Sequence, residues 1–242
     1  MATRCAACPL RTRPLFKPFT DEDVRAMQRF KAGELTVEAG TAVMIEGSSA
    51  PQLYTALRGL GLRYKTLRTG RRQVVNFLYP GDFIGLQAAM MGEMRHSVEA
   101  TTRMTLCVFD RAEFWRFVRA NPERAYDVVW LAAVEEHFLG EALASVGQRS
   151  AVERIAWALV RIFRRGQATG LTYGATMPLP YRQQDLADAL GLSLVHTNKT
   201  LARLRERQLA SWSDRILQIN DIDALAAIAD IEGRVPPMRP LM

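Results

Sequence analysis

Residues 183–204 restrict the fold more than any other part of the chain, because two short helical patterns flank a tight turn. Ala187 is small at the point where two helices would cross closely. Gly191 can adopt the positive φ angle of such a turn, and Ser193 can cap the helix that follows. Apolar residues at helical spacing predict a shared core, made by Leu186, Leu190, Leu201 and Leu204. The segment therefore predicts a helix-turn-helix.

The second predicted helix carries side chains that suit DNA reading near its N-terminus, the part of a recognition helix that enters the major groove. Asn198 can form two hydrogen bonds with adenine, Lys199 can reach guanine acceptors, and Val195 can contact a thymine methyl group. We predict base contacts for these three residues. We predict phosphate contacts for five other residues of the motif and its surroundings: Gln183, Gln184, Ser193, His196 and Arg215.

Residues 209–219 alternate between apolar and polar side chains around a turn at Ser213-Asp214, which predicts a two-stranded wing with Arg215 near its tip. Helix pairs in metabolic proteins also show helix-turn-helix spacing, so the wing is what favours DNA. The formal net charge of +7 favours an anionic partner as well, although a basic solvated surface would give the same charge. We therefore predict a DNA-binding winged helix.

The N-terminal half of the chain, from about residue 30 to 109, has the pattern of short strands separated by turn residues, which predicts a small antiparallel barrel. Residues 53–58 alternate as a strand with one buried face should, with Leu53, Thr55 and Leu57 opposite Tyr54, Ala56 and Arg58. Residues 62–65 and 74–78 continue the pattern less strictly.

Two capping boxes mark the starts of helices further along the chain. Asp110 with Glu113 opens a helix that ends near Asn121. Ser150 with Glu153 opens a helix with one apolar face, which begins a new core. The segment 164–176 is a predicted loop, and the proline-rich residues 236–240 predict a frayed tail.

Between these two boxes lies a predicted long helix that starts at Pro122 and contains no breaker except Gly140. Spacings of three and four alternate along one stripe, formed by Val129, Ala132, Glu136, Leu139, Leu143 and Val146. This spacing is typical of a coiled-coil seam. The stripe covers only about two and a half heptads and includes a glutamate, so packing against its own domain is the alternative.

The order of barrel, long helix and winged helix resembles the Crp/Fnr family of regulators over nearly the whole chain, most specifically at residues 191–201. The resemblance implies an α+β fold with a cyclic-nucleotide-binding-type double-stranded β-helix (jelly roll) as sensor. It implies a homodimer through the long helix, a palindromic DNA site, and RNA polymerase as a partner if the protein activates transcription. The expected parts are a cysteine-containing segment 1–15, a sensor domain 16–121, a dimerisation helix 122–148, a DNA-binding domain 149–233 and a tail 234–242.

By this resemblance, residues 80–85 form the turn that leads into the phosphate-binding cassette of the sensor domain. Leu86 stands where nucleotide binders place a glutamate for the ribose, and His96 stands where they place a phosphate-pairing arginine. Losing a charged acceptor and a bidentate donor should remove most cyclic-nucleotide affinity, unless Arg95 takes over the phosphate. We therefore expect no activation by cyclic AMP. The candidate effector pocket comprises Gly85, Leu86, Arg95, His96 and Ser97.

The three cysteines match in part the ligands of the oxygen-labile iron-sulfur cluster that the family is known for. Cys5 and Cys8 have ligand spacing, and Cys107 lies where the barrel ligand is expected. A cluster usually takes four thiolates, and Phe16 stands where one of them is expected. Three readings therefore stay open: a cluster, redox sensing through thiols alone, and a buried Cys107 with two idle surface thiols.

Other classes of function find less support. A regulatory subunit that acts on a protein partner would need an intact nucleotide cassette, and a cupin-like enzyme would need clustered metal ligands. The three histidines, at positions 96, 137 and 196, are scattered, so we predict that the chain is not an enzyme. It has no signal-peptide pattern and no apolar run of membrane-spanning length, so we expect a cytoplasmic protein that does not associate with membranes.

Overall fold

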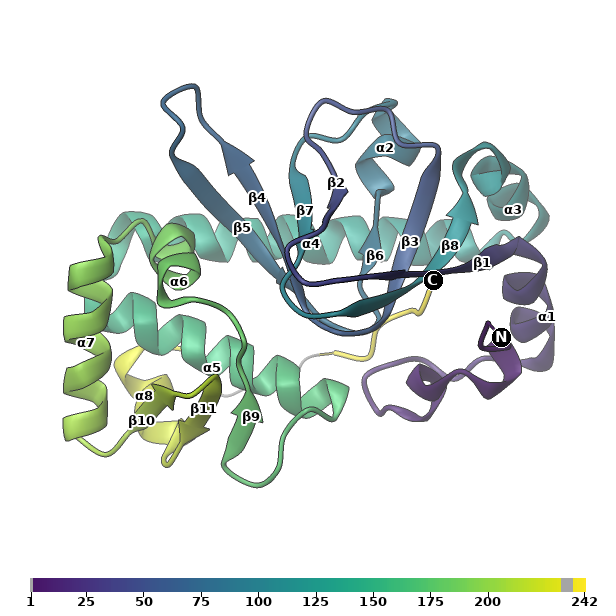
Figure 1. Cartoon of the computed structure of the whole chain (residues 1–242). Coiled ribbons are helices and arrows are strands. Elements are labelled where there is room, and N and C mark those ends of the chain that lie inside the picture. The colour runs from purple at the N-terminus through teal and green to yellow at the C-terminus, as the bar shows by residue number, and fades with distance from the viewer. Residues whose placement is uncertain (1, 232–236) are drawn as a thin grey trace. The chain divides into compact units, whose positions relative to one another are not determined.

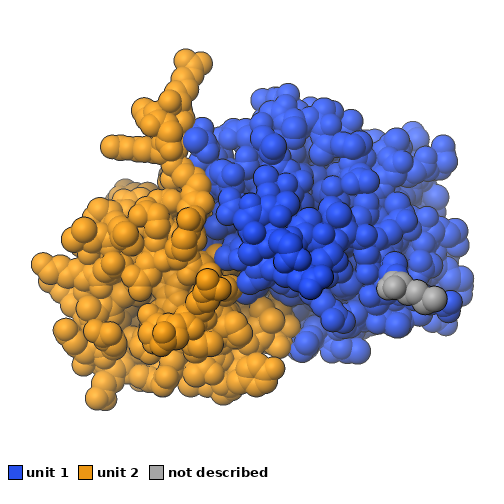
Figure 2. Space-filling view, in the orientation of Figure 1, with its two compact units in different colours: residues 1–66, 75–135, 238–242 blue, residues 67–74, 136–237 orange. Residues whose placement is uncertain are grey.

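The computed structural model describes residues 2–231 and 237–242. The chain forms two compact units, coloured separately in Figure 2. Unit 1 comprises residues 1–66, 75–135 and 238–242, and unit 2 comprises residues 67–74 and 136–237. The 26-residue helix α4 (Glu123–Gln148) contributes residues to both units (Figure 1). Within the described ranges, no helix is long and apolar enough to cross a membrane.

Two four-stranded sheets form the jelly roll that the sequence predicts for the sensor domain. The first has the strand order β1 (Lys31–Val37), β8 (Met104–Asp110), β3 (Gln52–Arg58) and β6 (Phe83–Ile84). The second has the order β2 (Ala42–Met44), β7 (Ser97–Ala100), β4 (Gly61–Thr66) and β5 (Arg72–Leu78). The short helix α2 (Leu86–Met91) follows β6. The predicted α+β fold of a jelly roll, a long helix and a winged helix is confirmed.

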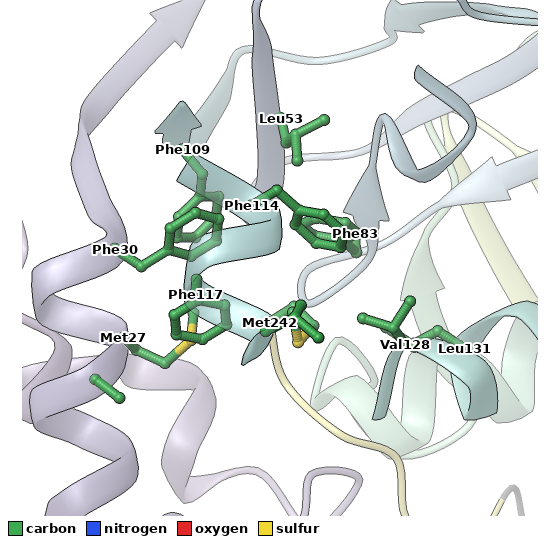
Figure 3. Close-up of a cluster of buried hydrophobic side chains, with 12 residues drawn as sticks. Met27, Phe30, Leu53, Phe83, Phe109, Phe114, Phe117, Val128, Leu131 and Met242 are labelled. Atoms are coloured by element: carbon green, nitrogen blue, oxygen red, sulfur yellow. The ribbon is translucent and has the colours of Figure 1, made fainter. Parts of the chain in front are cut away.

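Strand β3 departs from the prediction of a single buried face. Leu53, on one face, packs in an aromatic cluster with Phe109 and Phe114 (Figure 3). Tyr54 and Ala56, on the other face, belong to a second buried cluster inside the jelly roll. The prediction is wrong because β3 is an inner strand, between β8 and β6, and has apolar layers on both sides.

The helices of unit 1 begin at caps that are visible in the sequence. Helix α1 (Asp21–Phe30) starts with a capping box in which Thr20 Oγ1 accepts from the Asp23 amide at 3.1 Å. The 3₁₀ turn η3 (Arg111–Glu113) starts where Asp110 accepts from the Ala112 amide at 2.9 Å, and α3 (Phe114–Ala120) continues from it. Two further 3₁₀ turns, η1 (Cys5–Ala7) and η2 (Pro9–Thr12), lie near the N-terminus.

Unit 2 is built around helix α5 (Ala151–Thr169), whose predicted capping box is present: the Ser150 amide donates to Glu153 Oε2 at 2.6 Å. Its buried face includes Ile155 and Leu159, both fully inaccessible to solvent. The remaining elements are β9 (Thr176–Pro178), α6 (Gln183–Leu190), α7 (Leu194–Glu206), β10 (Ala210–Ser213), β11 (Ile216–Ile219) and α8 (Ile222–Ile228). Strands β10, β11 and β9 form one sheet in that order.

The last described residues contradict the prediction of a frayed tail. Residues 238–242 belong to unit 1, and Arg239 forms a parallel bridge with Phe16. Leu241 and Met242 are both buried. The tail is ordered because its apolar side chains join the core of unit 1, a long-range contact that local composition does not reveal. Residues 234–236 of the predicted tail lie outside the described residues.

Candidate nucleic-acid interface

The turn between α6 and α7 has the geometry that the sequence predicts. Gly191 ends α6 with a φ angle of +64°, in the left-handed region that favours glycine. Ser193 caps α7, and its hydroxyl oxygen accepts from the His196 amide at 3.2 Å. Ala187 is fully buried where the two helices meet. These local features set the direction in which α7 leaves the turn.

The buried face of α7 differs in part from the predicted core. Leu204 is buried as expected, but Leu201 is only half-buried. Thr197 and Thr200 fill the inner face instead, and the Thr200 hydroxyl donates to the His196 carbonyl at 2.9 Å. Positions 197, 200 and 204 have helical spacing, so the pattern was available in the sequence. It is missed when threonine is counted as polar.

The outer face of α7 carries all three predicted base-contacting residues. The Val195 side chain is 77% exposed, and Asn198 and Lys199 are also exposed. Because Thr197 and Thr200 point inward, residues 195, 198 and 199 lie on the opposite face of the first two turns. The structure thus gathers an amide, an ammonium and an apolar side chain on one accessible surface.

The wing follows α7 as predicted. Strands β10 and β11 pair with an antiparallel register from Ala210 opposite Ile219 to Ser213 opposite Ile216. Asp214 and Arg215 form the turn with φ angles of 50° and 61°, as a two-residue hairpin turn of type I′ requires. Arg215 is exposed at this turn, which places a cation at the tip of the wing.

The predicted phosphate-contacting residues occupy different environments. Ser193 uses its oxygen in the cap, so its hydroxyl proton remains able to bond a phosphate. His196 is exposed and Gln183 is half-buried. Gln184 is exposed and its amide donates to Asp188 Oδ1 at 2.6 Å, which holds the side chain in place. Further cations are exposed towards the end of α7, at Arg203, Arg205 and Arg207.

In unit 1, the candidate effector residues are engaged in contacts of their own. Gly85 caps α2, and Leu86 packs against the aromatic cluster. The exposed Arg95 pairs with Glu93 at 2.8 Å. The hydroxyl of the buried Ser97 accepts from the Glu46 amide at 3.0 Å. Arg95 therefore has a carboxylate partner at the surface.

A partly buried polar network close to His96 is absent from the sequence prediction. Arg63 of β4 pairs with Glu135 of α4 at 3.0 Å, and Asn76 of β5 donates to the same carboxylate at 3.1 Å. Arg63 also donates to the Phe83 carbonyl at 2.9 Å. Burial, together with the positive charge of Arg63, lowers the pKa of His96 from 6.5 to about 4. His96 is therefore a neutral side chain near neutral pH.

The three cysteines lie near one another in unit 1. Cys5 and Cys107 both pack against the aromatic cluster. Burial raises the pKa of the Cys107 thiol to about 11, opposed by the positive charge of Lys31 and reinforced by Cys8 and Cys5. Burial also raises the pKa of the Cys5 thiol, so the structure favours the protonated form of Cys5 and of Cys107.

These residues do not fit a cluster that is held by four thiolates. The position of the expected fourth ligand is occupied by Phe16, a buried residue that has no thiol and whose ring packs closely against Gly81. In the described part of the chain, no group of three or more histidine, cysteine, aspartate or glutamate side chains is arranged to hold a metal ion. The iron-sulfur ligand set Cys5, Cys8 and Cys107 therefore finds no support in the geometry.

A winged helix-turn-helix that follows a jelly-roll domain and a long helix defines a DNA-binding regulator of transcription. Family models agree with this class: residues 34–121 match a cyclic nucleotide-binding domain, and residues 153–228 match a Crp-like helix-turn-helix domain. The chain belongs to the Crp/Fnr family of transcriptional regulators. This membership confirms the prediction of a DNA-binding regulator that is not an enzyme.

Several curated relatives align with most of this chain. The nitrogen fixation regulation protein FixK of Bradyrhizobium diazoefficiens is 30% identical over 200 residues, which cover 83% of each chain. The transcriptional activatory protein AadR of Rhodopseudomonas palustris is 33% identical over 77% of this chain and 78% of its own. The transcriptional activator protein FnrL of Cereibacter sphaeroides is 27% identical over 96% of this chain and 95% of its own.

Among solved structures, FixK2 from Bradyrhizobium japonicum has the same fold. It superposes with a TM-score of 0.74 at 24% identity, over 81% of this chain and 96% of its own. The Crp-family regulator TTHB099 from Thermus thermophilus superposes with a TM-score of 0.67 at 22% identity, over 83% of this chain and 100% of its own. Both likenesses concern the fold.

Proposed function

We propose that two copies of the chain pair through α4 and bind a palindromic DNA site. Val195, Asn198 and Lys199 of each α7 contact bases. The observation that carries the proposal is the exposure of these three side chains on one face of a capped helix. A two-fold dimer presents α7 twice, and half-sites on one side of DNA are about 34–36 Å apart. A signal at the jelly roll alters packing along α4 and so changes the spacing of the two helices.

The apolar stripe of α4 supports pairing of two chains. Val129, Leu139 and Leu143 are 65%, 44% and 74% exposed in the single chain. Isolated exposed leucines need no explanation, but apolar residues that repeat by three and four along one helix are typical of a helix-helix interface. The stripe also includes the exposed Ala132 and Glu136 and the half-buried Val146. Its exposure favours a partner helix over packing within the same domain.

Removing a base-contacting side chain should weaken binding at one base position only. We expect Asn198→Ala and Lys199→Ala each to cost about 1–3 kcal/mol for the preferred base, because a bidentate contact discriminates by this amount. Binding should be measured by competition between a selected site and its single-base variants. Arg205→Ala is the matched control, expected to weaken all sequences alike and to reduce the salt dependence. If Asn198→Ala also weakens every sequence equally, base reading by Asn198 is wrong.

Five side chains supply the phosphate contacts in this proposal: Gln183, Gln184, Ser193, His196 and Arg215. They lie at the N-terminus of α6, at the cap and in the first turn of α7, and at the tip of the wing. The N-terminus of a helix attracts phosphate because its free amides and dipole favour an anion. Binding should therefore weaken steeply as the salt concentration rises.

Cyclic AMP should not be the signal. Arg95 pairs with Glu93, Ser97 accepts from a backbone amide, and Glu135 neutralises Arg63. A cyclic phosphate would therefore have to break existing contacts without the usual arginine in place of His96. We expect calorimetric titration of the dimer with cyclic AMP to give no saturable heat in the micromolar range. A micromolar dissociation constant would overturn this expectation.

Oxidation of thiols, in response to oxygen or another oxidant, is the second candidate signal. It is favoured by the position of Cys5 and Cys107, which come from two distant parts of the chain and pack against the same aromatic cluster. Burial holds both thiols protonated, so their oxidation should be slow at neutral pH. An iron-sulfur cluster is the less supported form of it, because a cluster usually takes four thiolates and the chain has three cysteines. Relatives that are named transcriptional activators favour activation, with RNA polymerase as a further partner of the DNA-bound dimer.

A further inference from the structure

The last described residues of the chain, 238–242, are held in unit 1 by specific polar contacts. Arg239 Nη1 pairs with Asp82 Oδ1 at 2.8 Å, and only 12% and 11% of the two side chains are exposed. The Arg239 amide donates to the Leu15 carbonyl at 2.8 Å. The Lys17 amide donates to the Arg239 carbonyl at 2.9 Å. A buried ion pair flanked by two backbone hydrogen bonds defines one orientation for this segment.

Met242 anchors the same segment in the aromatic cluster. It is 2% exposed and lies among side chains of β6, α3 and α4, with Phe117 on one side and Val128 and Leu131 on the other (Figure 3). Thr55 of β3 donates its hydroxyl proton to the Met242 carbonyl. Met242 therefore contacts both strand β3 and the N-terminal half of α4.

The partner of Arg239 belongs to a turn of functional interest. Asp82 lies in the Pro80-Gly81-Asp82 turn, which precedes β6 and the cassette helix α2. Its second carboxylate oxygen accepts from the Tyr79 amide at 2.8 Å, so one side chain holds both the turn and the tail. Phe16, whose backbone bridges to Arg239, packs its ring against Gly81 of the same turn. Tail and cassette turn are thus one contact network.

We propose that unit 1 carries a docking site for residues 238–242 of its own chain. The site is bounded by residues 15–17, by the turn 80–82 and by the first half of α4. It recognises an arginine through Asp82 and a methionine, three residues later, through the aromatic cluster. The segment follows the DNA-binding domain in the sequence, so its docking attaches the chain to unit 1 a second time after α4, through noncovalent contacts. The docked segment is separable from the fold of unit 1, so it can be released while the jelly roll stays folded.

Hydrogen exchange of the Lys17 amide in the full chain tests this docking, because that amide bonds the tail directly. We expect Arg239→Glu and Met242→Asp to raise its exchange rate by at least roughly tenfold, since each places a carboxylate against a buried partner. Arg239→Lys keeps the positive charge, so the Lys17 amide should retain most of the protection that it loses in Arg239→Glu. Met238→Asp is the matched control, because Met238 is 50% exposed in the same segment. It should leave the rate unchanged.

Amides of β8 serve as an internal reference, because they report on opening of the jelly roll itself. The proposal requires Arg239→Glu to raise exchange at Lys17 and to leave β8 protected. Unchanged exchange at Lys17 in Arg239→Glu and Met242→Asp overturns it. A rise in Arg239→Glu that β8 shares also overturns it, because the tail would then be an inseparable part of the core.

Discussion

Replacement of Leu143 by aspartate should dissociate the dimer and remove tight binding to a two-fold symmetric DNA site. Leu143 is the most exposed large apolar residue of the α4 stripe, at 74%. In the proposed dimer it is buried against the partner helix, where an ionised carboxylate costs several kcal/mol. Since each 1.4 kcal/mol is a tenfold change, we expect the dimer dissociation constant to rise by roughly a thousandfold. Analytical ultracentrifugation measures this directly.

His137→Asp is the matched control for the dimer prediction. His137 is exposed on the same helix but lies away from the stripe, so an added carboxylate there remains in water. We expect its dimer constant to stay within a few fold of the wild type. If Leu143→Asp dimerises as tightly as His137→Asp, α4 pairs through another face or the two chains meet elsewhere.

Acidification should destabilise the sensor domain through His96. The pKa of His96 is about 4 in the folded chain and 6.5 in the unfolded chain, so between these two pH values the unfolded chain binds a proton that the folded chain does not. The contribution of His96 is constant above about pH 6.5 and declines as the pH falls towards 4. The full loss is about 3 kcal/mol, and His96→Gln should abolish it.

The pH prediction is tested by urea unfolding at pH 7 and pH 4.5. Carboxylates also titrate in this range. The change in unfolding free energy between pH 7 and pH 4.5 is therefore measured for the wild type and for His96→Gln, and the difference between the two changes is the contribution of His96. His137→Gln, at an exposed position, is the control and should follow the wild type. Equal pH dependence in the wild type and His96→Gln would show that His96 is protonated in the folded state.

Local signals predicted the parts of the fold that local chemistry determines. Gly191 has the positive φ that the turn needs, Ser193 caps α7, and Ser150 with Glu153 starts α5. Each depends on residues a few positions apart, so the sequence contains the whole cause. The Thr20 and Asp23 box before α1 is of the same kind and was open to the same reasoning.

Contacts between distant segments could not be predicted in this way. Glu135 looks like an exposed helix residue, yet it pairs with Arg63 and Asn76, which come from two strands of the jelly roll. Likewise, nothing near Met242 in the sequence indicates that it packs in the core of unit 1. Such pairs follow from the topology, which places strands and helix side by side after local structure has formed. The contacts of Glu135 and Met242 both lie in the sensor domain. The structure of the DNA-binding domain could therefore be predicted from the sequence more fully than that of the sensor domain.

Selection of DNA from a random library by the wild-type chain is the most direct test of DNA reading by two copies of α7. We predict an inverted repeat whose half-sites are centred about 10–10.5 base pairs, or a multiple of that, apart. It also predicts that Asn198→Ala relaxes the selection at one symmetric pair of positions and leaves the spacing unchanged. Selection of a single half-site, or of no sequence at all, would contradict DNA reading by two copies of α7.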